Sequence, residues 1–175
     1  MATTTTAWIL VILLFISHHG TMADETFIVS TCAKTPSPKT CVPILESDSR
    51  SYNATTLEEL TDISIDISLA SINVALQHAV ALSIEYRGKP EYGPLLRCIN
   101  YDYGNAVLAL REAVKNAANK QYSQAEMSVQ NAQNLTATCE KEFVSQSIKS
   151  LLTDTNLMLE DRCALSAYLA YELTS

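Results

Sequence analysis

Apolar residues recur at steps of three and four along four long segments of the chain, as the buried face of an α-helix requires. The segments run from about Thr56 to Tyr86, from Cys98 to Asn119, from Tyr122 to Phe143, and from about Ser147 to Leu173. Short polar connections separate them. Because helices joined by short loops pack antiparallel, the pattern predicts an all-α, up-and-down four-helix bundle.

The first of these segments carries two competing signals. Ile63 to Leu69 alternates with period two, which is typical of a half-buried strand. A helix is favoured because two rows of apolar residues keep helical spacing over a longer stretch, and because Thr56 and Glu59 stand at the spacing of a capping box. The two rows predict a wide apolar face that packs against two neighbours. They are Leu60, Ile63, Ile67, Ala70 and Val74, and Ile65, Leu69, Ile72, Leu76 and Val80.

The second and third segments place two cysteines close together. Cys98 begins one arm, 21 residues before Asn119, and Cys139 lies near the end of the other, 18 residues after Gln121. At about 1.5 Å per residue the two arms match to within roughly one turn. A bridge between Cys98 and Cys139 would therefore clamp the open end of the helical pair.

The remaining cysteines suggest one more bridge and one free thiol. Cys32 and Cys41 are nine residues apart, and Pro36 and Pro38 between them forbid a continuous helix, so a bridge there would lock a turn. Cys163 stands in the middle of the last predicted helix and is interpreted as a buried free thiol, with an intermolecular bridge as the alternative. No Cys-x-x-Cys pair indicates a metal site.

The N-terminus is typical of a secretory signal peptide. Trp8 to Ile16 is an unbroken apolar run of nine residues, too short to span a bilayer, and small residues follow at Thr21 to Ala23. We expect residues 1–23 to be removed and residues 24–175 to form a single domain with no membrane span. A buried N-terminal helix is the alternative.

The composition favours this interpretation and excludes several functions. The chain has 175 residues, of which 47% are hydrophobic, with only four Gly and five Pro, which suits one helical domain with a core. Its net charge of −7 offers no basic stripe for nucleic acid. No catalytic, phosphate-binding or zinc-protease motif occurs, and His78 is the one histidine of the expected mature chain. We therefore expect no enzyme activity, catalytic residue, cofactor or metal.

The ordered set of cysteine, tyrosine and proline positions resembles one known family. The motifs are Cys32, Thr35, Pro38 and Cys41, the polar link at 47–51, Cys98, the Tyr-x-x-Ala steps at Tyr103 and Tyr122, and Thr138-Cys139. With these motifs the chain resembles the plant invertase and pectin methylesterase inhibitor family over essentially all of residues 24–175.

The resemblance implies a structure and an activity. It implies the bridges Cys32–Cys41 and Cys98–Cys139, the first of them linking a short N-terminal helical hairpin. It also implies a secreted protein of the apoplast or cell wall, with the vacuole as an alternative. The implied partner is a carbohydrate-active enzyme, which the protein would inhibit by reversible 1:1 binding over the substrate cleft.

Three departures from the family pattern refine these expectations. Tyr103 lies five residues after Cys98, where many members have a tyrosine at four, so a local shift of this helix is expected. Residues 130–134 lack the Ser-Ala-Ala-Leu-Thr stretch common in pectin methylesterase inhibitors. Lys120 to Tyr122 lacks the Pro-Lys-Phe motif of invertase inhibitors, which puts pectin methylesterase ahead of invertase as target. The sequence assigns no target-contact residues.

Two further features stay open at the level of sequence. Asn53 and Asn134 each begin an N-glycosylation sequon. The chain also allows two functions without inhibition: a secreted signalling bundle like the helical cytokines, and a family member with another partner.

Overall fold

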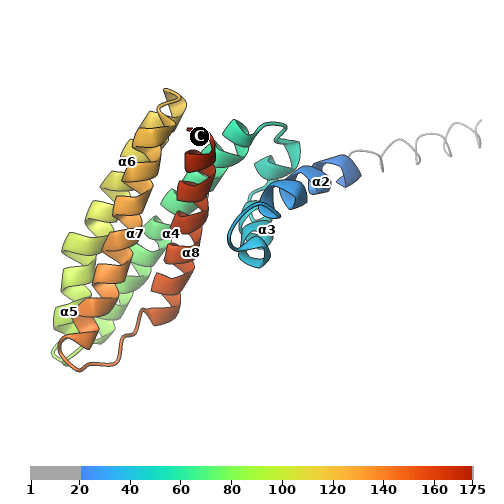
Figure 1. The fold of residues 1–175 in the computed structure, drawn as a ribbon. Coiled ribbons are helices and arrows are strands. Elements are labelled where there is room, and N and C mark those ends of the chain that lie inside the picture. The colour runs from blue at the N-terminus through green and yellow to red at the C-terminus, as the bar shows by residue number, and fades with distance from the viewer. Residues whose placement is uncertain (1–20, 175) are drawn as a thin grey trace, which may run out of the picture.

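The computed structural model describes residues 21–174, and every regular element within that range is a helix. The bundle consists of α4 (Leu57–Glu85), α6 (Gly104–Ala118), α7 (Tyr122–Val144) and α8 (Thr153–Glu172), as Figure 1 shows. The shorter elements are α2 (Thr21–Cys32), α3 (Pro38–Glu46), the 3₁₀-helix η2 (Ser49–Asn53), α5 (Tyr92–Arg97) and the π-helix η3 (Cys98–Tyr103). The predicted four-helix bundle is confirmed.

The start of α4 follows from its capping residues. The Thr56 hydroxyl accepts a hydrogen bond from the Glu59 amide at 3.2 Å, and the Glu59 carboxylate accepts one from the Thr56 amide at 3.1 Å. This reciprocal pair satisfies two amides that the first turn leaves without partners. The alternating stretch from Ile63 to Leu69 lies inside the helix, so the prediction of a helix there is confirmed.

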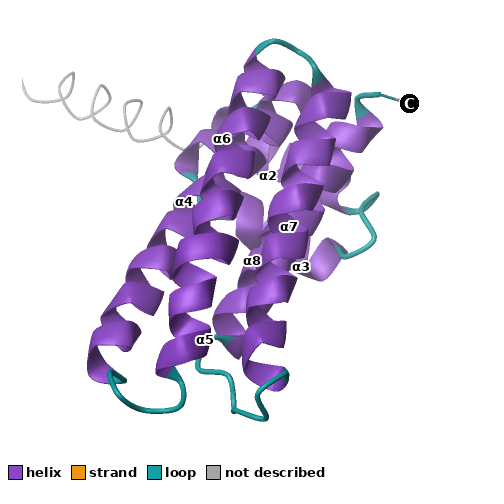
Figure 2. Ribbon diagram, turned by 90° about the vertical axis from the view of Figure 1, so that its left-hand side faces the viewer, coloured by secondary structure: helices purple, strands orange, loops and turns teal. Residues whose placement is uncertain are grey.

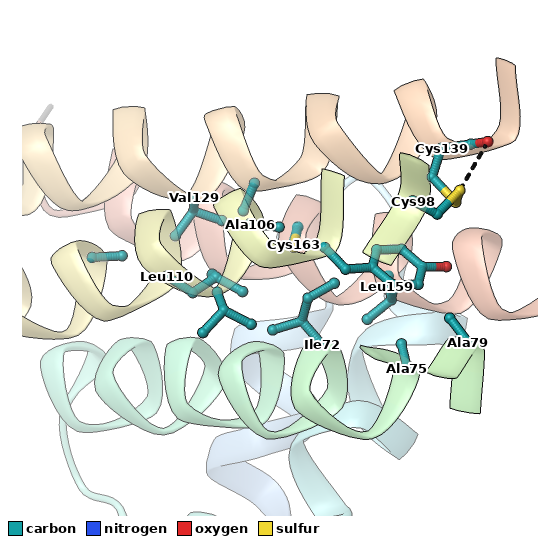
Figure 3. Close-up of a cluster of buried hydrophobic side chains, with 14 of the residues drawn as sticks. Ile72, Ala75, Ala79, Cys98, Ala106, Leu110, Val129, Cys139, Leu159 and Cys163 are labelled. Atoms are coloured by element: carbon teal, nitrogen blue, oxygen red, sulfur yellow. Dashed lines mark hydrogen bonds between the residues drawn. A yellow bond between two sulfur atoms is a disulfide. The ribbon is translucent and has the colours of Figure 1, made fainter. Parts of the chain in front are cut away.

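Two hydrophobic cores meet on α4. The larger lies inside the bundle and takes Ile65 from this helix, together with Ile72, Ala75 and Ala79, which Figure 3 labels. The smaller lies under the N-terminal hairpin and takes Leu60, Ile63 and Ile67. The wide apolar face predicted for this helix thus serves two neighbours, as a helix between two packing layers must.

The C-terminal part of the predicted row that begins at Leu60 is exposed, however. Ala70 is exposed, and the side chain of Val74 is 65% exposed, because the hairpin covers only the first half of α4. By length and hydropathy alone α4 could cross a membrane, and it is the one described helix that could. Its packing against α6, α8 and the hairpin accounts for most of its apolar residues.

The N-terminal hairpin is held by a disulfide and by contact with α8. Cys32 at the end of α2 is bonded to Cys41 in α3, with their Cα atoms 5.5 Å apart. The Tyr168 hydroxyl of α8 donates to the carbonyl of Lys34 in the intervening turn at 2.7 Å. Pro38 opens α3, where its missing amide costs nothing. The predicted disulfide-linked hairpin is confirmed.

The last helix begins later than the apolar pattern predicted. It starts at Thr153 rather than near Ser147, because α7 ends in a Schellman motif. Ser147 has a φ of 58°, its amide donates to the Val144 carbonyl, and the next amide donates to the Phe143 carbonyl. The loop that follows still buries Leu152, which is why the apolar period continued through it.

The predicted signal peptide falls almost wholly outside the described residues. Residues 1–20 are not described, and Thr21 to Ala23 are the first residues of α2. The cleavage after Ala23 therefore stays a prediction.

Candidate functional site

One side of the bundle is left uncovered by the hairpin. The hairpin packs mainly on η2, α4 and α8. Figure 2 views the bundle from the side away from the hairpin and shows α6 and α7 in front, with α2 and α3 behind. We call the surface formed by the outward side chains of η3, α6 and α7 the open face. Its members include Tyr101, Leu108, Glu112, Met127, Gln130 and Asn134.

The α7 part of the open face is apolar and rich in amides, with little charge, whereas α6 adds the exposed Arg111, Glu112 and Lys115. Tyr101, Leu108 and Met127 are 61%, 60% and 58% exposed. Between Tyr122 and Thr138 the only charged residue is Glu126, while Gln and Asn side chains are frequent. Exposed apolar side chains rimmed by uncharged polar groups are typical of a surface that binds another protein.

The lower end of the open face is shaped by a π-helical turn. Residues Cys98 to Tyr103 form η3 between α5 and α6, and a methyl group at Gly104 would lie 3.2 Å from the Ile99 carbonyl oxygen. A π turn inserts one extra residue into a helix. Cys98 and Tyr103, five residues apart, are both fully buried as a result. The local shift that the sequence predicted in this helix is therefore confirmed.

An exposed charged and aromatic group sits on this turn. The Arg97 Nε donates to Glu142 Oε2 of α7 at 2.6 Å, and the Arg97 guanidinium lies 5.7 Å from the centre of the Tyr101 ring. Because the Arg97 side chain is 57% exposed, water screens this ion pair and its contribution to stability is small. The pair instead fixes the orientation of the guanidinium and the ring on the surface.

Asp102 lies directly behind this group and is buried. It is 4% exposed, and its Oδ2 has no hydrogen-bond partner among the described residues. Burial, together with the nearby Glu142 carboxylate, raises the pKa of Asp102 from 3.8 to about 6, against the lowering effect of Arg97. The residue therefore changes charge within the mildly acidic range.

A buried polar network holds η3 against α7 and α8. The Tyr103 hydroxyl donates to Asn156 Oδ1 at 2.6 Å, and Asn156 Nδ2 donates to Glu140 Oε2 at 2.8 Å. Ser150 and Thr153 also donate to the Glu140 carboxylate, at 2.8 and 2.7 Å. Burial raises the pKa of Glu140, but these hydrogen bonds outweigh it and the pKa is lowered overall. The network gives the open face a rigid base.

Next to the network, Cys98 and Cys139 are bonded, with their Cα atoms 4.9 Å apart (Figure 3). The Cys98 sulfur also lies 3.4 Å from the Cys139 carbonyl oxygen, a contact without a proton to donate. Ligand atoms of Cys98, Cys139 and Asp102 lie within 4.8 Å of one another. Because the two sulfurs are bonded to each other, they offer no thiolates to a metal ion.

The remaining residues singled out by the sequence lie apart from this base. Cys163 is a buried free thiol in α8, 1% exposed. Asn53 and Asn134 are both exposed, the first beside the hairpin and the second on the open face. Arg162 lies on the far side of the bundle, partly buried, where it donates to the Ser71 hydroxyl of α4. His78 is exposed on α4.

Sequence reasoning missed the residues that build the open face's lower end. Arg97 and Glu142 are 45 residues apart, and nothing in their local sequence marks them as a pair. Asn156 carried a usable signal, since it is a polar residue four positions after the buried Leu152 in an apolar series.

Comparison with known proteins identifies the family. The family model described as plant invertase/pectin methylesterase inhibitor matches residues 26–169. The chain belongs to this family. As a member of this inhibitor family it is not an enzyme, as the sequence predicted.

Individual relatives agree with this assignment. This chain is 29% identical over 160 residues to a pectinesterase inhibitor of Actinidia deliciosa. The alignment covers 89% of this chain and 85% of that protein. A pectin methylesterase inhibitor from Arabidopsis thaliana superimposes with a TM-score of 0.63 at 18% identity, covering 85% of this chain and 96% of that one. A mutant form of an Arabidopsis inhibitor gives 0.68 at 20% identity, covering 82% and 95%. These two likenesses show the shared fold.

Proposed function

We propose that this protein is a secreted inhibitor of pectin methylesterase. The family match over residues 26–169 and the pectinesterase inhibitor of Actinidia deliciosa carry the proposal. Residues 1–23 act as the signal peptide, residues 24–175 form the mature domain, and the protein works in the apoplast. Two disulfides suit that oxidising location.

The proposed mechanism is obstruction by the open face. One inhibitor binds one enzyme reversibly, and α6 and α7 lie across the substrate cleft. Tyr101, Leu108 and Met127 support this choice of surface, because they are apolar, exposed and carried on rigid helices. A few desolvated apolar anchors typically dominate such an interface, while the surrounding amides supply hydrogen bonds.

The test is a titration of the oxidised mature protein against a pectin methylesterase and an acid invertase at mildly acidic pH. We expect loss of pectin methylesterase activity at about one inhibitor per enzyme. Loss of invertase activity alone would transfer the proposal to invertase. No effect on either enzyme would leave a non-inhibitory member of the family.

Paired substitutions test the surface. Leu108→Glu and Met127→Glu each place a charge on the open face, and each should weaken inhibition at least about tenfold, since a desolvated unpaired charge is costly in an interface. Val74→Glu on α4 is the matched control, because Val74 is equally exposed at 65% and lies off the open face. Equal effects from all three would refute the choice of surface.

A further inference from the structure

A polar groove lies on the side of the bundle away from the open face. It has a volume of about 490 Å³ and runs between η2, α4 and α8. Asp66 and Asn73 of α4, Arg50 of η2 and Arg162 of α8 all line it. The proposed inhibitory surface uses none of these residues.

Arg162 brings an uncompensated positive charge to this groove. Its side chain is partly buried, and the Nη1 donates to the Ser71 hydroxyl, which in turn donates to the Ile67 carbonyl at 2.5 Å. Among the side chains of residues 27–174, no carboxylate forms an ion pair with it. Burial lowers the pKa of Arg162, and no neighbouring acid offsets that effect. A cation withdrawn from water usually has an anionic partner.

The other arginine of the groove shows the contrast. Arg50 contacts both oxygens of Asp48, the shorter distance being 2.8 Å, and its Nη1 donates to Asp66 Oδ2, also at 2.8 Å. These two carboxylates neutralise the Arg50 guanidinium and accept hydrogen bonds from all three of its nitrogens, so Arg50 attracts an anionic ligand less than an unpaired arginine does. The Arg162 guanidinium, by contrast, makes one hydrogen bond, to Ser71, and it lines a groove large enough for a small molecule.

Acceptors for hydroxyl groups lie in the same groove. Asp66 accepts from Arg50 through Oδ2 alone, which leaves its Oδ1 without a donor among the described residues. Asn73 uses its Nδ2 on the Leu69 carbonyl at 2.7 Å, which leaves its side-chain oxygen free. The Arg162 guanidinium and the two oxygen acceptors of Asp66 and Asn73 suit a molecule that carries both a carboxylate and hydroxyl groups.

We propose that this groove binds an acidic sugar, with the uronate carboxylate on Arg162 and ring hydroxyls on Asp66 and Asn73. The choice of a uronate rests on the proposed function, since a pectin methylesterase converts neutral methyl esters of galacturonate into carboxylates. The net charge of −7 disfavours a long polyanion, so the ligand is a short fragment or a chain end.

The binding test is a titration of ¹⁵N-labelled mature protein with galacturonate and with its trimer. We expect saturable shifts of the Ser71 and Asn73 amides. The methyl ester of galacturonate, which keeps the ring and loses the charge, should bind at least about tenfold more weakly, as loss of a charge-assisted hydrogen bond requires. Equal shifts with inorganic sulfate would mean nonspecific anion binding and would overturn the proposal, as would the absence of saturation.

Two variants assign the carboxylate contact. Arg162→Met keeps the apolar stem and removes the charge, and should weaken galacturonate binding about tenfold or more. Arg162→Lys keeps the charge without the planar fork and should fall between wild type and Arg162→Met. Arg111→Met is the matched control, because Arg111 is exposed on α6, and it should bind galacturonate like wild type. Unchanged binding by folded Arg162→Met would refute the site.

The inhibition assay separates this proposal from the previous one. Arg162→Met should inhibit pectin methylesterase as wild type does, since the groove and the open face lie on different sides. If wild type binds galacturonate but inhibits no esterase, the proposed function fails and the groove stands. If inhibition is normal and galacturonate does not bind, the proposal of a uronate site is refuted and the proposed inhibitory function is kept.

Discussion

The Tyr103 hydroxyl donates a 2.6 Å hydrogen bond to the side-chain oxygen of Asn156, joining the π-helical turn to α8 inside the bundle. Both residues are buried, at 0% and 1% exposure. Asn156 in turn donates to Glu140 of α7. The two residues therefore tie three helices together at the end of the bundle that the Cys98–Cys139 bridge closes.

Removal of this hydrogen bond should destabilise the fold measurably. Tyr103→Phe leaves Asn156 Oδ1 buried without a donor, so we expect a loss of about 1–3 kcal/mol in the free energy of unfolding. Urea denaturation measures it. Tyr101→Phe is the control, because that ring is 61% exposed, and it should change stability by no more than about 0.5 kcal/mol. Equal losses would show that the hydrogen bond contributes nothing.

Asp102 should make stability depend on pH. Its pKa rises from 3.8 to about 6 on folding, so the folded protein binds the proton more tightly than the unfolded chain does. The stabilisation that protonated Asp102 gives the folded protein is fully present below about pH 4 and is lost as the pH rises through 6. It amounts to a free energy of unfolding on the order of 3 kcal/mol in total.

The substitution Asp102→Asn tests this dependence. It should flatten the difference in unfolding free energy between pH 4 and pH 7, whereas Asp154→Asn, at an exposed site in the first turn of α8, should not. An unchanged pH profile in Asp102→Asn would contradict the assignment.

The two kinds of cysteine should differ in their effect on stability. The Cys98–Cys139 bridge spans 41 positions, for which loop-closure entropy gives about 4 kcal/mol. Cys98→Ser should therefore lower the melting temperature more than Cys163→Ser, which closes no loop. Equal shifts in the two melting curves would show that Cys163 has been assigned the wrong role.

Cys163 should also be chemically inert in the folded protein. Burial raises the pKa of its thiol to about 12, although a hydrogen bond with Ser68 lowers it slightly. Since the thiolate is the reactive form, a thiol reagent such as DTNB should label it only after unfolding. Rapid labelling under native conditions would show that α8 opens locally or that the thiol is accessible.

Gly104 and Gly93 form a matched pair of tests for the π turn. A methyl group at Gly104 meets the Ile99 carbonyl oxygen at 3.2 Å, whereas nothing lies within 4 Å at Gly93. Gly93→Ala restricts the unfolded chain, which is worth about 0.4–1 kcal/mol, but the Pro94 ring disfavours helical backbone at the residue before it, so the net change should lie within about 1 kcal/mol of zero. Gly104→Ala should be the less stable of the two variants, because the backbone at Ile99 must shift. Equal melting temperatures for the two variants would mean that the π turn tolerates a side chain.

The helices could be predicted from the sequence because apolar periodicity and capping residues depend only on residues close together in the chain. The apolar periods located all four bundle helices, and the Thr56–Glu59 spacing located the start of α4. The late start of α8 could not be predicted from apolar period, because the loop residue Leu152 is as buried as any helix residue. The Schellman motif at Ser147 has no glycine to reveal it.

The contacts of the site depend on which residues of neighbouring helices face one another. The spacing of residues along a single sequence does not give this information. On α8, Asn156 is buried in the core, whereas the preceding Thr155 is only partly buried. Arg162 of the same helix donates a hydrogen bond across to Ser71 of α4. Both depend on the register between helices, which only the packed bundle defines.

The turn between α6 and α7 lies inside the covalent loop that Cys98 and Cys139 close. It is exposed, and Lys120 there has a φ of 57°, at the position of a tryptic cleavage site. A protease that cuts after Lys120 would leave both fragments joined by the bridge and still packed in one core. A nicked molecule would migrate as a single species until reduced, so the protein can lose a peptide bond at this end and keep its shape.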